Sequence, residues 1–519
     1  MAYPDPGEPH GLITQLKVGM EVHVELATRT KMWTAAPNVA HPDYGDAEPN
    51  TLLDPVVLGL PGTLPVINRA AVELSARVGL ALNCSISRHT KWDRKSYAYP
   101  DLPKNYQISQ YDRPLCFDGA FDIKVEGNEG NAPDFDTKRI RITRAHLEED
   151  AGKLLHEIPG AGGGFSDGSL VDLNRAGTPL LEIVTEPDFA SADEAVAFGK
   201  ALRDVCRHLG ATQGVMQRGH MRFEPNINVL ITNSGGEVFA TPVVEIKNLN
   251  SFRAVHGAIV HEHHRQVEAW LADGKVMGAR AKTTRGWDDA KLVTTPQREK
   301  EDADEYRYFA DPDLVTLRIT DAYLDGLRAT QPELPGAKRA RYVEDYGLKP
   351  IDADNLLAEP SSTRFFEACV AAGGHTAEPR RVAAVLLNAG AKRANEAGVM
   401  LDGLGITPEQ VAGIVELQDD DKISGSAADK LFGLACDEDG DAEALAEKHG
   451  LLQVSDEGQL DAWIDEVLGD EKNAKAIEQI RGGKDKAIGA LLGQIMKLSK
   501  GQANPKAVGE KIKARLQDG

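Results

Sequence analysis

The spacing of apolar residues changes near Pro332, and this change limits the possible folds more than any other feature of the chain. Before it, apolar residues alternate with polar ones or form short runs, which is the pattern of β-strands separated by turns. After the sequence Pro-Glu-Leu-Pro, the residues Ala, Leu, Glu and Lys recur at helical spacing. The sequence therefore predicts an α+β protein, with strand-like segments at Met20–Leu26, Arg139–Thr143, Leu180–Val184 and Ile227–Thr232.

Two breaks divide the chain into three expected domains. The first is Pro332, and the second is the acidic run Cys436–Glu447 with the turn at Gly450, after which another set of short helices begins. We expect a large mixed α/β domain at 1–331, an all-α helical domain at 332–449 and a small helical tail domain at 450–519. Three domains suit a chain of 519 residues.

The tail combines clear helix signals with an unusual charge. Asn504 is a suitable N-cap, Pro505 suits the first helical position, and Lys513 and Arg515 fall in the final turn. The whole chain has a formal net charge of -21, which is unexpected for a nucleic-acid-binding protein. From Arg481 onward, however, nine basic residues stand against three acidic ones. This asymmetry predicts either a tail that contacts phosphate or a solvated surface.

Membrane insertion is not expected. No segment approaches the run of about 18 apolar residues that a membrane-spanning helix needs. The first ten residues are polar and contain no apolar stretch typical of a signal peptide. We therefore expect a cytoplasmic protein.

The segment Gly19–Leu26 alternates strictly between apolar and polar residues. As a strand, it places Met20, Val22, Val24 and Leu26 on one face, and Glu21, His23 and Glu25 on the other. The polar face is compatible with solvent exposure in an antiparallel sheet. It is also compatible with metal binding, because Mg²⁺ and Mn²⁺ prefer carboxylate oxygen and Mn²⁺ also accepts imidazole.

Two further segments carry acidic residues in strand-like surroundings. Glu182 interrupts an apolar run, and a buried carboxylate must be paired, hydrogen-bonded or bound to metal. An ion pair with Arg175 and a metal site both remain open at this point. The segment His146–Lys153 concentrates Glu148, Glu149 and Asp150, which could also begin a helix, where acids favour the helix dipole.

Two later segments, Arg222–Asn228 and Glu245–Ser251, place acids beside amides and a basic residue. Such groups suit phosphate and metal better than an apolar core. Asn250 or Ser251 can cap the helix that follows. The glycine-rich stretch Gly160–Gly168 lacks the Gly-Lys-Ser/Thr ending of a phosphate-binding P-loop, and we interpret it as a surface loop.

Taken together, several long motifs in this order resemble the GatB family, the B component of the aspartyl/glutamyl-tRNA amidotransferases. The resemblance covers nearly the whole chain and gives the expected layout of a cradle domain, a helical domain and a tail domain. The motifs are Gly19–Leu26, Tyr99–Gln110, His146–Lys153, Leu170–Pro179, Glu245–Phe252, Tyr306–Phe309 and Gly493–Pro505.

The resemblance implies a ligase that uses ATP and Mg²⁺. In this family, the cradle domain is expected to phosphorylate the side-chain carboxylate of Glu-tRNA(Gln) or Asp-tRNA(Asn). Ammonia from the amidase subunit then displaces the phosphate, within a heterotrimer (GatCAB) that also contains a small third subunit. The basic tail is expected to contact the body of the misacylated tRNA.

The resemblance also assigns residues. It implies Glu21, His23, Glu149, Glu182 and Glu224 as metal ligands, with Glu149 and Lys95 catalytic, and Lys95, Lys247 and Asn248 at the nucleotide. The sequence departs from the family in one of these segments. Where the family usually reads Arg-Cys-Asp-x-Asn, this chain reads Arg222-Phe-Glu-Pro-Asn226, so Glu224 keeps the carboxylate but adds a methylene.

Three alternatives compete with this interpretation. A non-catalytic scaffold that binds tRNA would use the same acids in structural ion pairs. The archaeal homologue dedicated to Glu-tRNA(Gln) carries an extra inserted domain, for which this chain has no spare segment of typical domain size. A metal-dependent phosphohydrolase would explain the acids but not the tail.

Overall fold

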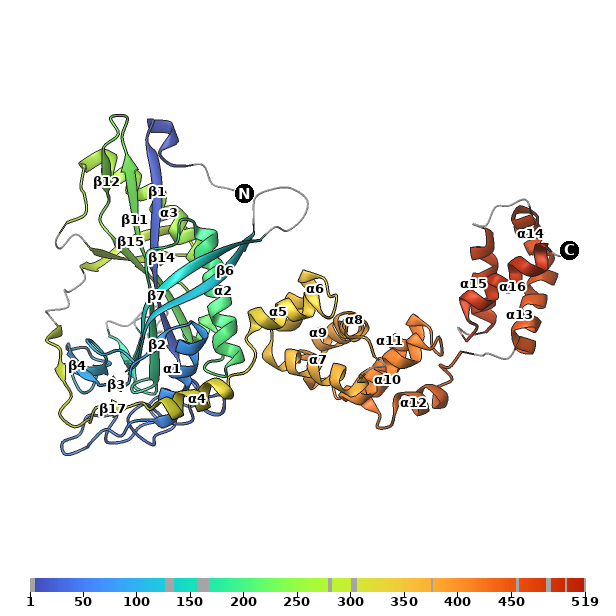
Figure 1. Ribbon diagram of the computed structural model, residues 1–519, viewed down its shortest axis with the longest axis horizontal. Helices are drawn as coiled ribbons and strands as arrows, with labels where there is room; N and C mark the ends of the chain where they lie inside the picture. The colour runs from blue at the N-terminus through green and yellow to red at the C-terminus, as the bar shows by residue number, and fades with distance from the viewer. Residues whose placement is uncertain are drawn as a thin grey trace. The chain divides into compact units, whose positions relative to one another are not determined.

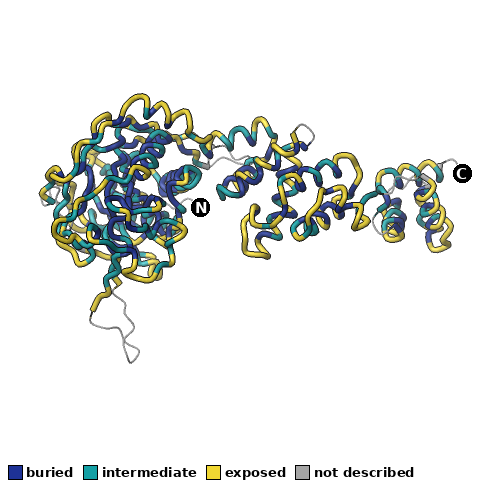
Figure 2. Tube along the Cα trace, turned by 90° about the horizontal axis from the view of Figure 1, so that it is seen from below, coloured by how far each residue is buried: buried dark blue, intermediate teal, exposed yellow. Residues whose placement is uncertain are grey.

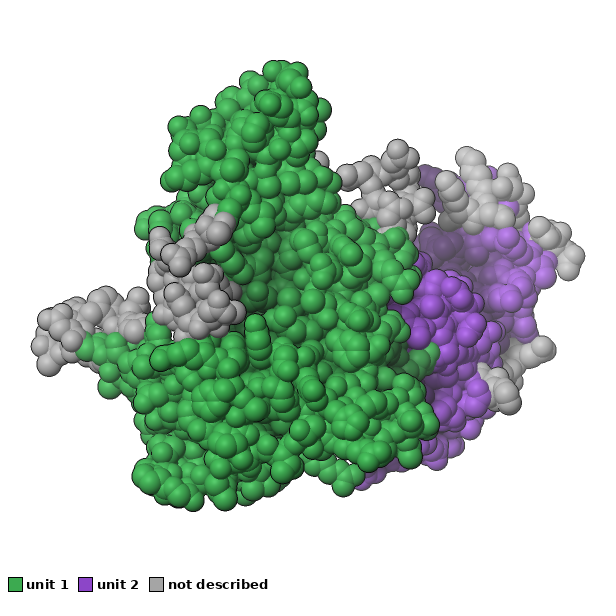
Figure 3. Space-filling model, turned by 60° about the vertical axis from the view of Figure 1, so that its left-hand side comes forward, with its two compact units in different colours: residues 1–334 green, residues 335–519 purple. Residues whose placement is uncertain are grey.

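The computed structural model describes residues 5–126, 135–155, 168–278, 282–299, 306–374, 377–453, 457–481, 487–499 and 502–517 (Figure 1). The chain divides into unit 1, residues 1–334, and unit 2, residues 335–519 (Figure 3). This division lies close to the predicted change at Pro332. The α+β fold class is confirmed, because unit 1 contains a large sheet and unit 2 is helical. The further division near 450 stays a prediction.

A ten-stranded sheet forms the centre of unit 1 in the described residues. Its strands follow the order β15-β14-β13-β11-β1-β10-β7-β6-β2, with β12 paired to β11. Among the described pairings of this sheet, only that of β13 with β14 is parallel. The strands are β1 (Ile13–Glu25), β2 (Ser85–Ile86), β6 (Cys116–Glu126), β7 (Phe135–Glu149), β10 (Pro179–Thr185), β11 (Met221–Thr232), β12 (Val238–Ala240), β13 (Val244–Lys247), β14 (Thr283–Asp288) and β15 (Val293–Glu299).

Three small sheets accompany the large one. β16 (Phe309–Ala310), β4 (Asp93–Ser96) and β5 (Tyr106–Ser109) form one of them, with β4 in the middle. β17 (Leu317–Arg318) pairs with β3 (His89–Thr90), and β8 (Lys153–Leu155) pairs with β9 (Leu170–Asp172). All four strand-like segments predicted from the sequence lie wholly or largely in strands of the large sheet.

One face of the large sheet is apolar and packs against helices. Met20, Val22 and Val24 of β1 are buried in a core that also contains Phe198 of α2 and Ile259 of α3. Figure 2 shows this buried interior enclosed by exposed loops and helix surfaces. The helices of unit 1 are α1 (Arg69–Ala81), α2 (Ala192–His208), α3 (Phe252–Asp273) and α4 (Asp321–Ala329), with short 3₁₀ turns at Glu8–His10, Pro42–Tyr44 and Met216–Arg218.

Unit 2 is helical in its described residues and contains two separate apolar clusters. One cluster is formed by residues between Tyr342 and Ala446, and the other by residues between Leu460 and Leu516. The helices are α5 (Pro335–Glu344), α6 (Pro350–Leu357), α7 (Pro360–Gly373), α8 (Pro379–Val385), α9 (Ala391–Ala397), α10 (Pro408–Asp419), α11 (Gly425–Asp437), α12 (Ala442–Lys448), α13 (Glu457–Gly469), α14 (Ala474–Arg481), α15 (Ile488–Leu498) and α16 (Pro505–Gln517). The short turns are a π-helical turn at Leu386–Gly390 and 3₁₀ turns at Leu401–Gly403 and Glu471–Asn473.

Two predicted helix starts are confirmed. The Ser251 hydroxyl accepts a hydrogen bond from the backbone N–H of Ala254 at 3.1 Å, which caps α3. The Asn504 side chain accepts bonds from Lys506 and Ala507, and α16 begins at Pro505. Most of the predicted loop Gly160–Gly168 lies outside the described residues. Within the described residues, no helix is long and apolar enough to cross a membrane.

Candidate active site

The polar face of the sheet is built by the register of its central strands. His23 of β1 lies opposite Glu182 of β10 on one side and Arg222 of β11 on the other. Glu182 in turn lies opposite His146 of β7. Because side chains directly across neighbouring strands share a face, residues far apart in the chain form one polar row.

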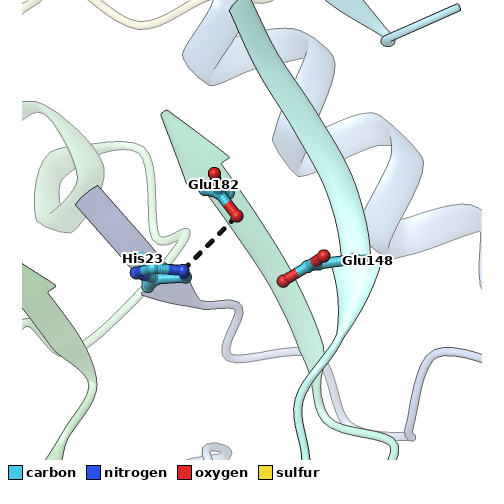
Figure 4. Close-up of side chains that lie close together, drawn as sticks. All are labelled: His23, Glu148 and Glu182. Carbon is cyan, nitrogen blue, oxygen red and sulfur yellow. Dashed lines mark ion pairs between the residues drawn. The ribbon is translucent and has the colours of Figure 1, made fainter. Parts of the chain in front are cut away.

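Three of these side chains form the histidine group, which we define as His23, Glu148 and Glu182. Their ligand atoms all lie within 4.8 Å of one another. Figure 4 shows the three side chains, from neighbouring strands, lying close together. The imidazole Nε2 of His23 lies 3.4 Å from Oε2 of Glu182. His146 Nε2 lies 3.5 Å from the same oxygen and 3.7 Å from Glu148 Oε2. One imidazole and two carboxylates are a donor set that divalent cations accept.

The charge states of the histidine group depend on one another. Burial opposes the charged imidazole of His23, but the hydrogen bond with Glu182 and the charge of Glu224 outweigh it and raise its pKa. Burial also disfavours the charged carboxylate of Glu182, yet His146 and His23 hold its pKa well below its usual range. Glu148 behaves in the same way, with Lys95 and His146 lowering its pKa against burial. Both carboxylates are therefore ionised at neutral pH.

The histidine group also leaves buried polar atoms open. In the described part of the chain, His23 Nδ1 and Glu148 Oε2 are buried and have no hydrogen-bond partner. Such atoms are uncommon, because a buried polar atom without a partner is unfavourable by roughly 1–3 kcal/mol. A bound cation would satisfy Glu148 Oε2. The residues present therefore fit the divalent metal that the sequence predicts.

Glu149 is placed differently from the prediction. It belongs to the same strand as Glu148, so the two neighbouring side chains point to opposite faces. Its carboxylate accepts bonds from the Lys104 ammonium and, at 2.9 Å, from the backbone N–H of Ile108. The structure brings His23 and Glu182 together with Glu148 and does not bring Glu149 into that group. The alternative that this segment begins a helix is wrong, because β7 continues through Glu149.

The alternative of an ion pair between Glu182 and Arg175 is not what the structure contains. The guanidinium of Arg175 donates to the backbone carbonyls of Ala151 and Gly152, at 3.0 and 2.6 Å. It also lies 3.7 Å from Asp150 Oδ2. Glu182 instead contacts the two histidines. Its carboxylate thus lies on the polar face beside two imidazoles.

A second acidic cluster, the lysine group, consists of Glu21, Glu224 and Glu245. Its ligand atoms also lie within 4.8 Å of one another. Lys247 binds the carboxylate of Glu224 and lies 2.9 Å from Oε1 of Glu245. Lys282 Nζ lies 3.7 Å from Glu245 Oε2. Burial opposes the charge of Lys247, but the carboxylates of Glu224 and Glu245 raise its pKa.

Glu224 lies between the two groups. Its Oε1 lies 3.9 Å from Nδ1 of His23, while its Oε2 binds Lys247. Glu21 accepts a hydrogen bond at 3.1 Å from the side-chain amide of Asn226. Asn248, predicted at the nucleotide, is exposed and adopts a positive φ of 66° directly after β13. The predicted metal residues other than Glu149 thus lie on one face of the sheet.

Lys95 lies on β4 and faces the histidine group. In the described residues, its ammonium makes no ion pair within 4.0 Å, and it lies 5.1 Å from the ring centroid of Tyr306. Burial opposes its charge, but Glu148, Tyr308 and Glu182 together raise its pKa. A charged ammonium held over an aromatic face without a bonded carboxylate is suited to binding an anion.

Among the residues that belong to the two acidic groups or contact them, His146, Glu148, Glu245 and Lys282 have no role assigned from the sequence. The sequence holds a signal for two of them. His146 and Glu148 alternate with the apolar Leu147 in a segment that follows strand-like residues, and this alternation predicts that both side chains lie on one face of a strand. For Lys282, no local signal exists, since it joins the lysine group only through the pairing of β14 with β13.

Comparison with known proteins identifies the family of this chain. A family model described as the GatB/GatE catalytic domain matches residues 16–325, and one described as the GatB domain matches residues 364–516. Among curated relatives, the aspartyl/glutamyl-tRNA(Asn/Gln) amidotransferase B subunit of Caldanaerobacter subterraneus is 42% identical over 96% of this chain and 98% of its own length. The corresponding proteins of Thermosynechococcus vestitus and Ralstonia nicotianae are 42% and 44% identical, over 99% and 97% of this chain and 99% of their own lengths. The chain therefore belongs to the GatB family of tRNA-dependent amidotransferase subunits.

Proposed function

We propose that this chain uses ATP to activate a side-chain carboxylate of an amino acid esterified to tRNA, so that ammonia can replace one oxygen. The observation that carries this proposal is the Lys95 ammonium, which has no ion-pair partner among the described residues and faces the ionised carboxylates Glu148 and Glu182. A fixed positive charge next to a divalent-cation donor set is what phosphoryl transfer needs.

The chemistry explains why activation is required. A carboxylate is a poor acyl donor to ammonia, because the departing group would be oxide. Phosphorylation of one carboxylate oxygen creates phosphate as the leaving group, and ammonia then forms the new C–N bond. In such a transfer, catalysis comes from positioning and charge stabilisation rather than from a covalent protein nucleophile.

Each group of residues has a proposed role. Lys95 would bind a phosphate oxygen and stabilise the charge of the transferring group. His23, Glu148 and Glu182 would hold Mg²⁺, which supplies charge neutralisation of the phosphates when bound. Glu21, Glu224 and Glu245 could hold a second cation, in which case Lys247 would be displaced toward phosphate, with Asn248 beside it. Glu149 would position this strand end through Lys104.

We further propose the partners and substrates that the relatives' names indicate. Those names describe one component of an amidotransferase for aspartyl- and glutamyl-tRNA, so this chain would assemble with an amidase subunit and a small third subunit in the cytoplasm. Glu-tRNA(Gln), Asp-tRNA(Asn) or both would be the substrate.

The proposed contact between the tail and tRNA needs one adjustment. Across residues 450–519, acidic and basic residues are equal in number, with 11 of each. Asp461 of α13 pairs with both Lys511 and Arg515 of α16, at 3.1 and 3.0 Å. The positive charge seen from Arg481 onward is therefore partly neutralised by acids of the preceding helix. Lys475, Lys497 and Lys506 are exposed and would be the phosphate contacts.

The test is ATP hydrolysis by the chain, co-purified with its amidase partner, in the presence of Mg²⁺ and with or without Glu-tRNA(Gln). We expect hydrolysis that depends on misacylated tRNA, and its loss in Lys95→Met and His23→Ala with tRNA affinity retained. Tight tRNA binding by the wild type without such hydrolysis would overturn the proposal in favour of a non-catalytic scaffold.

A further inference from the structure

A row of five tyrosines lies beside Lys95 and takes no part in the chemistry proposed above. The residues are Tyr99, Tyr97, Tyr306, Tyr308 and Tyr111, in the order in which their rings contact one another. They come from three separate segments, around β4, after β5 and before β16. The chain has only 11 tyrosines, so their concentration here is a specific feature of this surface.

The contacts along the row are regular. Three successive pairs meet edge to face, with ring centroids 5.9 to 6.1 Å apart. The last pair, Tyr111 and Tyr308, is stacked, with centroids 4.5 Å apart and planes inclined by 10°. Edge-to-face and stacked pairs hold aromatic rings in fixed orientations. The row is therefore a continuous aromatic surface.

Both ends of the row are open to solvent. Tyr99 is 41% exposed and Tyr111 is 54% exposed, which is unusual for large rings that already contact other rings. Tyr308 stacks on Tyr111, and Tyr111 still keeps more than half of its surface exposed. The solvent-exposed end of the row is therefore an aromatic ring that a further planar group can reach.

The row is also connected to the proposed reaction centre. Lys95 Nζ lies 5.1 Å from the ring centroid of Tyr306 and 6.0 Å from that of Tyr97. The Tyr97 hydroxyl donates to Gln107 Oε1 at 2.9 Å, and Gln107 Nε2 donates to Glu148 Oε1 at 3.3 Å. An anion held by Lys95 would thus have an aromatic platform on the same side, and a nucleotide presents both of these chemistries in one molecule.

From this arrangement we propose that the tyrosine row is a stacking platform for an adenine base, with the exposed Tyr111 as the ring that receives it. The inference rests on the proposed function, because it uses Lys95 as the phosphate-binding group. Aromatic stacking accepts a base through its π-face and adds affinity without reading hydrogen bonds. Two adenines are present in the proposed reaction, that of ATP and the terminal adenosine of the acceptor strand of tRNA.

The experiment uses 2-aminopurine, whose fluorescence is quenched when it stacks. Two probes are titrated onto the full-length chain: 2-aminopurine riboside triphosphate with Mg²⁺, and an acceptor-stem RNA whose 3′-terminal adenine is replaced by 2-aminopurine. The variants are Tyr111→Leu, Tyr111→Phe and Tyr99→Leu. The control is Tyr44→Leu, since Tyr44 lies under Arg29 in the same unit and outside the row.

We expect Tyr111→Leu to weaken one probe by roughly 5- to 100-fold and to abolish its quenching. Tyr111→Phe and Tyr44→Leu should retain both. Loss with the triphosphate alone assigns the platform to ATP, and loss with the RNA alone assigns it to the acceptor end.

Wild-type binding of both probes that no row variant changes would overturn the platform and leave the proposed function standing. Equal weakening in Tyr111→Leu, Tyr111→Phe and Tyr44→Leu would also overturn it, because that pattern reports general loss of structure. Failure of the wild type to bind either probe would overturn both the platform and the proposed function.

Discussion

The histidine group and the lysine group lie on the same face of the same sheet, yet they differ in the cations that face them. The carboxylates of the lysine group are bonded by Lys247, whereas Lys95 faces the histidine group without bonding to it. A carboxylate that is already paired with an ammonium must exchange that partner before binding a metal. We therefore expect the histidine group to bind a divalent cation more readily than the lysine group. In the lysine group, the ammonium of Lys247 already neutralises part of the carboxylate charge.

The pKa values of three lysines in unit 1 also depend on how nearby carboxylates balance burial. Lys95 and Lys247 are partly buried beside carboxylates that raise their pKa. Lys31 is fully buried, and its ammonium donates to the backbone carbonyl of Ala176 at 2.6 Å. Burial lowers the pKa of Lys31 to about 8. At Lys31, burial outweighs the charges of Asp54, Glu149 and Asp172, whereas at Lys95 and Lys247 the carboxylates outweigh burial.

The largest effect is expected from Glu148→Gln compared with Glu149→Gln. Glu148→Gln keeps the shape but removes a charged ligand of the histidine group, so Mg²⁺-dependent ATP turnover should fall by about 100- to 1000-fold. Glu149→Gln should lower turnover much less, because its partner is Lys104. Turnover and Mn²⁺ affinity are measured for both variants. A larger loss in Glu149→Gln would reverse the assignment of the metal ligand and restore the interpretation from sequence alone.

The next effect is a change of the free energy of unfolding with pH, caused by the titration of Lys31. Its folded pKa lies near 8, below its unfolded value of about 10.4, so between these values the unfolded chain binds more protons. The free energy of unfolding should therefore rise from pH 8 to pH 10, by up to about 3 kcal/mol relative to Lys31→Met, which lacks this titration. Urea unfolding followed by the buried Trp33 and Trp92 measures the difference. Parallel pH profiles for both proteins would contradict the expected titration.

Lys247→Met tests the compensation within the lysine group. Removing the ammonium leaves the carboxylates of Glu224 and Glu245 close together, which should lower stability by about 1–2 kcal/mol after allowance for solvent at this partly exposed lysine. Mn²⁺ should raise the thermal midpoint of the variant more than that of the wild type, since the cation replaces the lost charge. Scanning calorimetry with and without Mn²⁺ provides the comparison. An identical Mn²⁺ shift in both proteins would mean that the lysine group takes no metal.

The smallest effect is expected at the surface of the tail. Asp461→Ala removes the acid that pairs with Lys511 and Arg515, and surface pairs contribute only about 0–1 kcal/mol. Stability should change little because the apolar residues Leu491, Ile495 and Ile512 hold these helices together. Removal of this negative charge makes the surface of α16 more positive, which should strengthen tRNA binding severalfold at low salt, with a steeper salt dependence. Unchanged affinity in filter-binding assays would argue against tRNA contact at this face of α16.

Sequence patterns predicted strands and helix starts correctly where these depend only on residues that are neighbours in the chain. The alternation of Gly19–Leu26 predicted a strand with one polar face, and β1 has that strand. Asn504 and Ser251 predicted helix starts, and both cap the helices α16 and α3. These features depend on backbone dihedrals and hydrogen bonds between residues that are neighbours in sequence. Their physical causes are local, so the sequence alone was sufficient.

The sequence by itself thus determined the fold class, the family and several residues of the polar face, His23, Glu182 and Glu224 among them. Only the tertiary structure decided that Glu148 rather than Glu149 joins His23 and Glu182, and that Arg175 binds elsewhere. It also decided that α13 neutralises part of the basic tail. The reason is that strand register and helix pairing are set by burial across the whole unit, and a shift of one residue exchanges the faces on which neighbouring side chains lie.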